Sequence, residues 1–170
     1  MADRVLSWPS RLMAMQYKGF DRIRERRAFE VAREPGEFGG DLTAFRGHRQ
    51  ALIVTFKRSG EPVPTAVNFG LSDDGKLHFR SEPHVAKIRR LRRDPHVRVC
   101  PCNLRAKPLG PMVEAHGRIL PDEESERSYA SLEANWRPEM KVLERALDRF
   151  DVPVVYVEVT PVSAPGAAGG

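Results

Sequence analysis

The chain has 170 residues, of which 41% are hydrophobic and 30% are charged, and its formal net charge is +5. This length suits one domain with its own core and is short for two. No apolar run approaches the roughly 20 residues that cross a bilayer, and the N-terminus lacks the apolar stretch of a signal peptide. We therefore expect a soluble, cytoplasmic protein with no membrane partner, whose positive charge attracts anions.

The beginning of the chain differs in composition from the rest. Residues 1–40 are rich in arginine and glutamate, show only partial helical periodicity and end in the glycine-rich stretch EPGEFGG. We predict an N-terminal helical extension over residues 1–40, a main domain over residues 41–162 and a disordered tail over residues 163–170. Three roles stay open for the extension, which are covering the main domain, extending a dimer and remaining mobile.

From Gln50 onward the pattern changes to an alternation of polar and apolar residues with short turns. The segments QALIVTFK, VPTAVNFGL and KLHFRS predict three strands joined by turns at Gly60 and Gly75. HVRVCP, MVEAHGRIL and DVPVVYVEVTP predict three more strands, and residues 121–136 and 137–150 predict two helices. Six strands joined mainly by hairpins, with helices after the third and the fifth, indicate an antiparallel barrel.

The segment from Leu77 to Val99 predicts a strand, a basic helix and a second strand. Ser81 is placed to cap the helix, whose first turn then holds Glu82 and Pro83. The start of a helix presents backbone N–H groups and a partial positive charge, which suits a phosphate.

Helical spacing divides the cations of this segment into groups. Lys87 lies near the predicted helix start and is the best candidate for a phosphate ligand, with Arg80 at the strand end as the second. Arg90 shares the face of Lys87 and is a possible addition. The alternative is that KIRRLRR forms only a solvated helix face.

Other kinds of site find little support in the sequence. Cys100 and Cys102 fall in one CPC tripeptide, which predicts buried structural thiols and no metal site. No aromatic residue lies within the basic helix, which disfavours nucleic-acid binding. No side chain is assigned as catalytic, since His116, solvent and the loop over residues 107–111 are equal candidates for a proton donor.

The stretch from Phe45 to Leu120, together with the last strand, resembles a known superfamily. Its most specific parts are KIRRLRRDPHVRV and the KPLGP turn. They resemble the split β-barrel superfamily of pyridoxamine 5'-phosphate oxidase-like flavin and deazaflavin enzymes. More narrowly, the chain is similar to the actinobacterial oxidoreductases that depend on the deazaflavin coenzyme F-420. The resemblance implies a mainly β fold, a six-stranded antiparallel split β-barrel of the FMN-binding type with inserted and flanking helices.

The resemblance also implies site residues and a partner. Family members are homodimers with both cofactor sites at the interface. Lys87 matches the lysine that binds the cofactor phosphate, and Arg80 and Ser81 match the polar positions that complete this grip. In the family, one strand runs along the tricyclic ring of the cofactor, and the matching residues here are Thr65, Ala66, Val67 and Asn68. Another family segment approaches the cofactor from the second subunit, and it is matched here by Pro101 and the loop from Lys107 to Pro111.

Two departures from the superfamily pattern bear on the cofactor. Flavin-binding oxidases carry Ser-Arg-Lys where this chain has Val85, Ala86 and Lys87, so one phosphate-binding arginine is missing. The Arg-Leu-x-Pro ending associated with pyridoxamine phosphate oxidation is also missing. The resemblance therefore implies an oxidoreductase that transfers hydride from coenzyme F-420 to an unsaturated small organic acceptor. An FMN-dependent reductase and a non-catalytic flavin- or deazaflavin-binding protein remain as alternatives.

Overall fold

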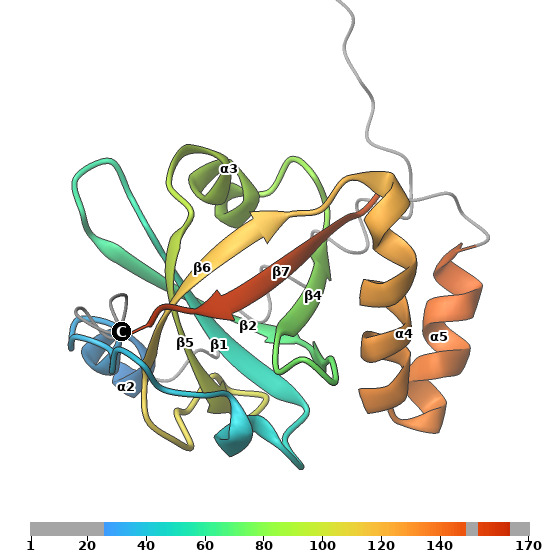
Figure 1. Ribbon diagram of the computed structural model, residues 1–170, viewed down its shortest axis with the longest axis horizontal. Coiled ribbons are helices and arrows are strands. Elements are labelled where there is room, and N and C mark those ends of the chain that lie inside the picture. Colours follow the sequence, from blue (N-terminus) through green and yellow to red (C-terminus); the bar gives the residue numbers. More distant parts are fainter. Residues whose placement is uncertain (1–25, 149–152, 164–170) are drawn as a thin grey trace, which may run out of the picture.

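The computed structural model describes residues 26–148 and 153–163, and one curled antiparallel sheet dominates this part of the chain (Figure 1). Seven strands follow the order β2-β1-β5-β6-β7-β4-β3. Their bounds are β1 (Gln50–Phe56), β2 (Pro62–Asn68), β3 (Gly70–Leu71), β4 (Leu77–Ser81), β5 (His96–Cys102), β6 (Val113–Ile119) and β7 (Val155–Pro161). The predicted fold class, a mainly β split barrel with inserted helices, is confirmed.

The helices lie outside this sheet and at one end of it. Figure 1 shows α3 at the upper end of the barrel and α4 and α5 side by side along one flank. Their bounds are α2 (Arg26–Val31), α3 (Ala86–Arg93), α4 (Ser125–Asn135) and α5 (Pro138–Asp148), with short 3-10 turns at η1 (Thr43–Phe45) and η2 (Asp122–Glu124). No helix in the described ranges is long and apolar enough to span a bilayer. Residues 1–25 of the predicted extension and residues 164–170 of the predicted tail lie outside the described residues.

The predicted strand VPTAVNFGL is divided in the structure, which gives seven strands instead of six. Its first part forms β2 against β1, and its end forms β3 against β4 at the opposite edge of the sheet. Phe69, which stands between them, is buried, and its ring meets Phe45 edge-on at 5.5 Å between centroids. The chain thus crosses the core at Phe69 and changes its pairing partner. The turns predicted at Gly60 and Gly75 are confirmed, since both glycines have φ near +80°.

Strand β1 is apolar on both faces, so it contributes to two separate clusters. Ala51 and Ile53 point into the barrel, where they join the main core. Leu52 and Val54 point outward into an outer cluster whose other members are Ala28, Ala32, Cys100, Cys102, Ala106 and Met112. The described part of the N-terminal segment therefore covers the outside of the barrel. The two thiols are buried as predicted, and burial raises the pKa of each to about 12.

A buried carboxylate holds this cover in place. Glu114 on β6 accepts hydrogen bonds from the backbone N–H of Gly36 at 2.8 Å, from Nε of Arg98 at 2.7 Å, and contacts Nε2 of His96 at 2.5 Å. Arg98 in turn donates to the backbone carbonyl of Glu34 at 2.9 Å. Burial raises the pKa of Glu114, but the hydrogen bonds from His96, Gly36 and Arg98 outweigh it and hold this pKa below its ordinary value.

The predicted cap of helix α3 is wrong. Ser81 is the last residue of β4, where it pairs with Val155 of β7, and this pairing keeps it extended. The helix begins later, with Val85 as its N-cap residue and without a side-chain hydrogen bond to the cap. The predicted inward face of the helix is confirmed, because Ile88 and Leu91 are buried in the main core.

Gly70 allows α4 to pack directly on β3. A Cβ atom at this position would lie 2.1 Å from the backbone carbonyl oxygen of Ser131. We expect Gly70→Ala to lower the free energy of unfolding by about 3 kcal/mol, since backbone must move to relieve the overlap. Urea unfolding measures the loss. Ser131→Ala, which alters only the side chain of the facing residue, should stay within about 0.5 kcal/mol of the parent. Equal stability of Gly70→Ala and the parent would contradict this packing.

Replacement of Glu114 tests the anchor of the N-terminal cover. Glu114→Gln should lower the free energy of unfolding by about 3 kcal/mol at neutral pH, because it leaves Arg98 without its ionic partner. The pKa of Glu114 is lowered in the folded state, so its contribution is full above the ordinary glutamate pKa and fades as the pH falls toward the lowered one. Urea unfolding at neutral and acidic pH measures the free energy of unfolding of the parent and of Glu114→Gln. The difference between the two should be smaller at acidic pH.

The exposed Glu124, paired with Arg118 at 2.6 Å, provides the control. Glu124→Gln should leave the free energy of unfolding nearly unchanged at both pH values, because an exposed ion pair contributes little to stability. A loss in Glu114→Gln that stays the same at both pH values would argue against a charged anchor.

Candidate functional site

Strand β4 presents two different faces near the start of helix α3. Phe79 points into the barrel and is part of the main core, and Ser81, two residues later, shares this face. Arg80 lies on the opposite face, where its guanidinium carbon stands 5.2 Å from the ring centroid of Trp136. The structure therefore separates Arg80 from Ser81, although the two are adjacent in sequence.

Lys87 stands over Phe79, the residue whose face of β4 Ser81 shares. It is the second residue of α3, its exposure is only 7%, and its Nζ stands 5.7 Å from the ring centroid of Phe79. Attraction between an ammonium group and an aromatic face grows when both are shielded from water. The amino group is thus held at the end of the barrel and does not extend into solvent as in a freely solvated helix face.

The start of α3 adds backbone donors to this place. Its N-cap residue, Val85, offers no side-chain acceptor, and the first intrahelical bond runs from the N–H of Arg89 to the carbonyl of Val85. The N–H groups of the first turn have no partner within the helix and carry the positive end of its dipole. An anion near this end would be stabilised by both effects.

Ser81 gives an independent sign of a missing partner. Its exposure is 2%, and its Oγ has no hydrogen-bond partner in the structure. A buried hydroxyl without a partner has lost its hydrogen bonds to water, and no hydrogen bond within the protein replaces them. Such groups are therefore uncommon. We call Ser81, Lys87 and the first backbone N–H groups of α3 the anion site.

Glu82 follows Ser81 and is a residue that sequence reasoning treated only as part of a helix start. It is half-buried, and its Oε1 is shielded from solvent without a hydrogen-bond partner. Burial raises the pKa of Glu82, while Lys87 and His84 act in the opposite direction. The position of Glu82 directly after a predicted strand is the sequence feature that could have indicated its place next to the anion site.

Arg90 is occupied elsewhere than at the anion site. Its Nε donates to Oγ1 of Thr55 at 2.8 Å, which ties α3 to the end of β1. The predicted addition of Arg90 to the phosphate grip therefore remains a prediction without support from this geometry.

The four predicted ring-contacting residues lie on β2, at one edge of the sheet. Thr65 and Val67 point toward the barrel interior, and Ala66 and Asn68 point outward. Their side chains thus share no single face. Within the described residues β2 forms a ladder with β1 alone, so its other edge leaves backbone groups open to a flat ligand.

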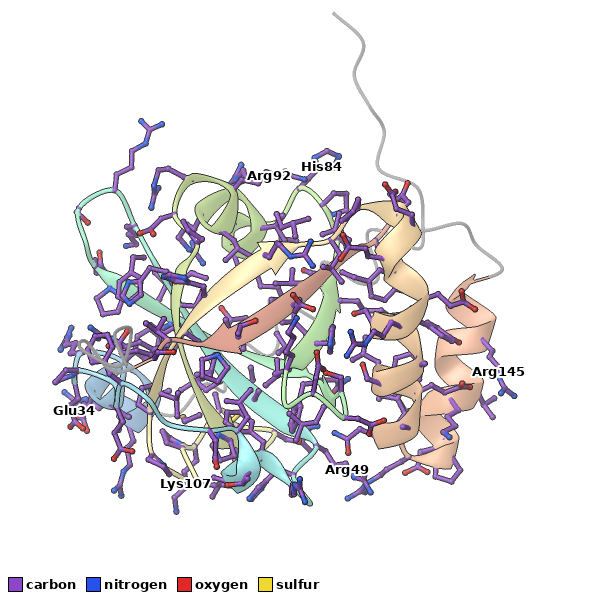
Figure 2. The ribbon with its side chains drawn as sticks, in the orientation of Figure 1. Glu34, Arg49, His84, Arg92, Lys107 and Arg145 are labelled. Carbon is purple, nitrogen blue, oxygen red and sulfur yellow. The ribbon has the colours of Figure 1, made fainter. Side chains whose placement is uncertain are left out.

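The loop after β5 lies far from the anion site in the same chain. Figure 2 shows Lys107 at the opposite end of the barrel from His84 and Arg92, which flank the start and the end of α3. Pro101 is buried in β5, whereas Pro111 is exposed. One chain therefore does not bring these residues to the start of α3.

Neither His116 nor His78 is part of the anion site. His116 is exposed on β6, opposite His96 and Thr160 in the register. His78 is buried against Ser72, at 3.2 Å between Nε2 and Oγ, and burial lowers its pKa. Over residues 26–148 and 153–163, no group of three or more histidine, cysteine or acidic side chains is arranged to hold a metal ion.

Removal of the Ser81 hydroxyl separates a ligand-binding role from a structural one. Without ligand, Ser81→Ala should leave the free energy of unfolding unchanged or raise it by up to about 1 kcal/mol, because the hydroxyl is buried without a partner. Thr55→Val is the contrasting variant, since it removes the acceptor of Arg90 and should cost about 1.5 kcal/mol. Thermal and urea unfolding measure both. A clear loss of stability in Ser81→Ala would assign the hydroxyl to the fold.

Solved structures share this fold at low sequence identity. Protein Atu2129 of unknown function from Agrobacterium tumefaciens is 19% identical over 81% of this chain and 57% of its own, with a TM-score of 0.53. The heme storage protein HutZ from Vibrio cholerae is 12% identical over 70% and 85%, with a TM-score of 0.52. The conserved hypothetical protein Rv2991 from Mycobacterium tuberculosis is 17% identical over 81% and 98%, with a TM-score of 0.51. These similarities concern the fold alone.

A comparison with family models reaches further. None of the curated proteins matches the chain. The model of the family described as pyridoxamine 5'-phosphate oxidase matches residues 41–160, which is well over half of the chain. This range runs from just before η1 to the penultimate residue of β7 and includes the anion site. The chain therefore belongs to the pyridoxamine 5'-phosphate oxidase family.

Proposed function

We propose that this protein is an oxidoreductase that uses the deazaflavin coenzyme F-420 to transfer hydride to an unsaturated small organic acceptor, with the cofactor bound where two copies of the chain meet. The observation that carries the proposal is the anion site. Ser81, at the end of β4, has a buried hydroxyl without a partner, and Lys87, in the first turn of α3, has a shielded ammonium group. This set of donors suits the phosphate of a cofactor.

The residues around Lys87 favour the deazaflavin over FMN. Flavin-binding members of the superfamily have an arginine where this chain has Ala86, the exposed first residue of α3. Arg80 does not replace it, because its guanidinium packs on Trp136 across β4. The anion site thus offers one buried lysine where an FMN site of this type has two cations.

The chain's own part in the reaction is binding, orientation and exclusion of water. When bound, the deazaflavin supplies the hydride from its ring. Lys87 and Ser81 would hold the phosphate, and the open backbone edge of β2 would align the ring. The buried ring of Phe79 beneath Lys87 keeps water from the ammonium group, which strengthens its attraction for an anion.

A second copy of the chain would complete the site. The loop from Lys107 to Pro111 lies at the far end of the barrel and needs a partner chain to approach a cofactor at α3 (Figure 2). This loop region also exposes two large apolar side chains, Leu104 at 63% and Leu109 at 46%. Apolar surface of this kind is what a subunit interface covers.

Titration with coenzyme F-420, followed by fluorescence anisotropy, tests the proposal. Lys87→Met keeps the unbranched chain in the core but removes the charge. We expect it to weaken binding by about 1.5 to 3 kcal/mol, because a charged hydrogen bond to phosphate is lost. Arg89→Met, at an exposed position of the same helix, should bind as the parent does.

Three outcomes would overturn the proposal in different ways. Equal affinity of Lys87→Met and the parent would show that the phosphate lies elsewhere. Tight binding of FMN without binding of coenzyme F-420 would favour an FMN-dependent reductase. Tight binding of reduced coenzyme F-420 without turnover of any unsaturated acceptor would favour a cofactor-binding protein.

A further inference from the structure

Glu82 directly follows Ser81 of the anion site and offers no hydrogen-bond donor to a phosphate when it is ionised. It joins β4 to α3, and its Oε1 is buried without a hydrogen-bond partner. The charged groups that act on its ionisation are Lys87 and His84, and Lys87 has the larger effect. A carboxyl group thus follows Ser81 in the chain and interacts with the charge of Lys87.

The presence of this carboxyl group limits the positive charge of the anion site. Lys87 contributes one charge, and the start of α3 contributes the equivalent of roughly half a charge. An ionised Glu82 removes one charge, which leaves about half a positive charge. Arg80 and Arg90 have other neighbours, because Arg80 packs on Trp136 and Arg90 donates to Thr55.

Phosphate groups differ in what they require from such a site. A phosphomonoester carries a charge of about −1.5 to −2 at neutral pH, because its second ionisation lies near pH 6. A phosphodiester has no second ionisation and carries a single negative charge. A dianion beside Glu82 must either stay close to a carboxylate or be accompanied by a proton for it, and both cost more than the binding of a monoanion.

We infer that Glu82 is a specificity-determining residue, which lets the anion site accept a singly charged phosphodiester and disfavours a dianionic phosphomonoester. This inference rests on the proposed function, because it names the ligand class of the same site. Coenzyme F-420 carries its phosphate as a diester. FMN carries a monoester, and so does the deazaflavin riboside 5'-phosphate, which has the same ring as coenzyme F-420 but no side arm.

The test compares two deazaflavins that share a ring, so that only the phosphate and the arm beyond it differ. Dissociation constants of coenzyme F-420 and of the deazaflavin riboside 5'-phosphate are measured by fluorescence anisotropy for the full-length parent and for Glu82→Gln. The monoester should bind about tenfold more tightly to Glu82→Gln than to the parent, whereas the affinity for the diester should change less than about threefold. Glu82→Ala removes the same charge and should shift the ratio in the same direction.

Glu139→Gln is the matched control, because it removes one negative charge from an exposed position on α5. It should leave both affinities unchanged. Equal shifts for the two ligands in Glu82→Gln, or no shift for either, would overturn the inference while binding of coenzyme F-420 that depends on Lys87 upholds the proposed function. Absence of coenzyme F-420 binding to the parent would overturn the proposed function and the inference together.

Discussion

Strand β1 is buried on both faces, and this constraint shapes the rest of the molecule. A sheet that curls around one core normally leaves its other face to solvent, but here Leu52 and Val54 place apolar side chains on the outside. The outer face consequently needs a cover, which Ala28 and Ala32 provide. This cover is short, and hydrogen bonds fix it to the barrel. Glu114 accepts two of them, one from the N–H of Gly36 and one from Nε of Arg98.

The N-terminal segment covers the outside of the barrel, and α3 lies at the end of the barrel. The cations of α3 point in different directions. Lys87 turns inward over Phe79, and Arg90 binds Thr55. Arg92 donates to the carbonyl of Pro83, and Arg93 donates to the carbonyl of Phe56. Arg90, Arg92 and Arg93 therefore tie the helix to its neighbours, whereas Lys87 belongs to the anion site.

Local patterns in the sequence predicted those parts of the fold that depend on local physics. Strand alternation, the turns at Gly60 and Gly75 and the inward face of α3 each follow from spacing within a few residues. The same holds for Cys100 and Cys102, whose burial follows from their residue type and spacing.

The features that local patterns missed depend on distant partners. From the local sequence Ser81 is predicted to be a helix cap, but in the fold it pairs with β7. That strand lies more than 70 residues later in the chain, so the local sequence gives no sign of the pairing. Gly70 packs against α4, whose Asn135 also donates to the carbonyl of Phe69, and Glu114 accepts a hydrogen bond from the N–H of Gly36. Lys87 was predicted from its position at a helix start, whereas the separation of Arg80 from it follows from the two faces of a strand and from Trp136.

We propose that the end of the barrel beside α3 holds the phosphate of a deazaflavin. A crystal structure of the protein with coenzyme F-420 tests this placement, because the phosphorus atom gives the strongest peak in the electron density of the ligand. We expect this phosphate within hydrogen-bond distance of Nζ of Lys87 and Oγ of Ser81, with the first N–H groups of α3 facing it. A phosphate held by Arg80 and Trp136 on the other face of β4, or by the loop from Lys107 to Pro111, would contradict it.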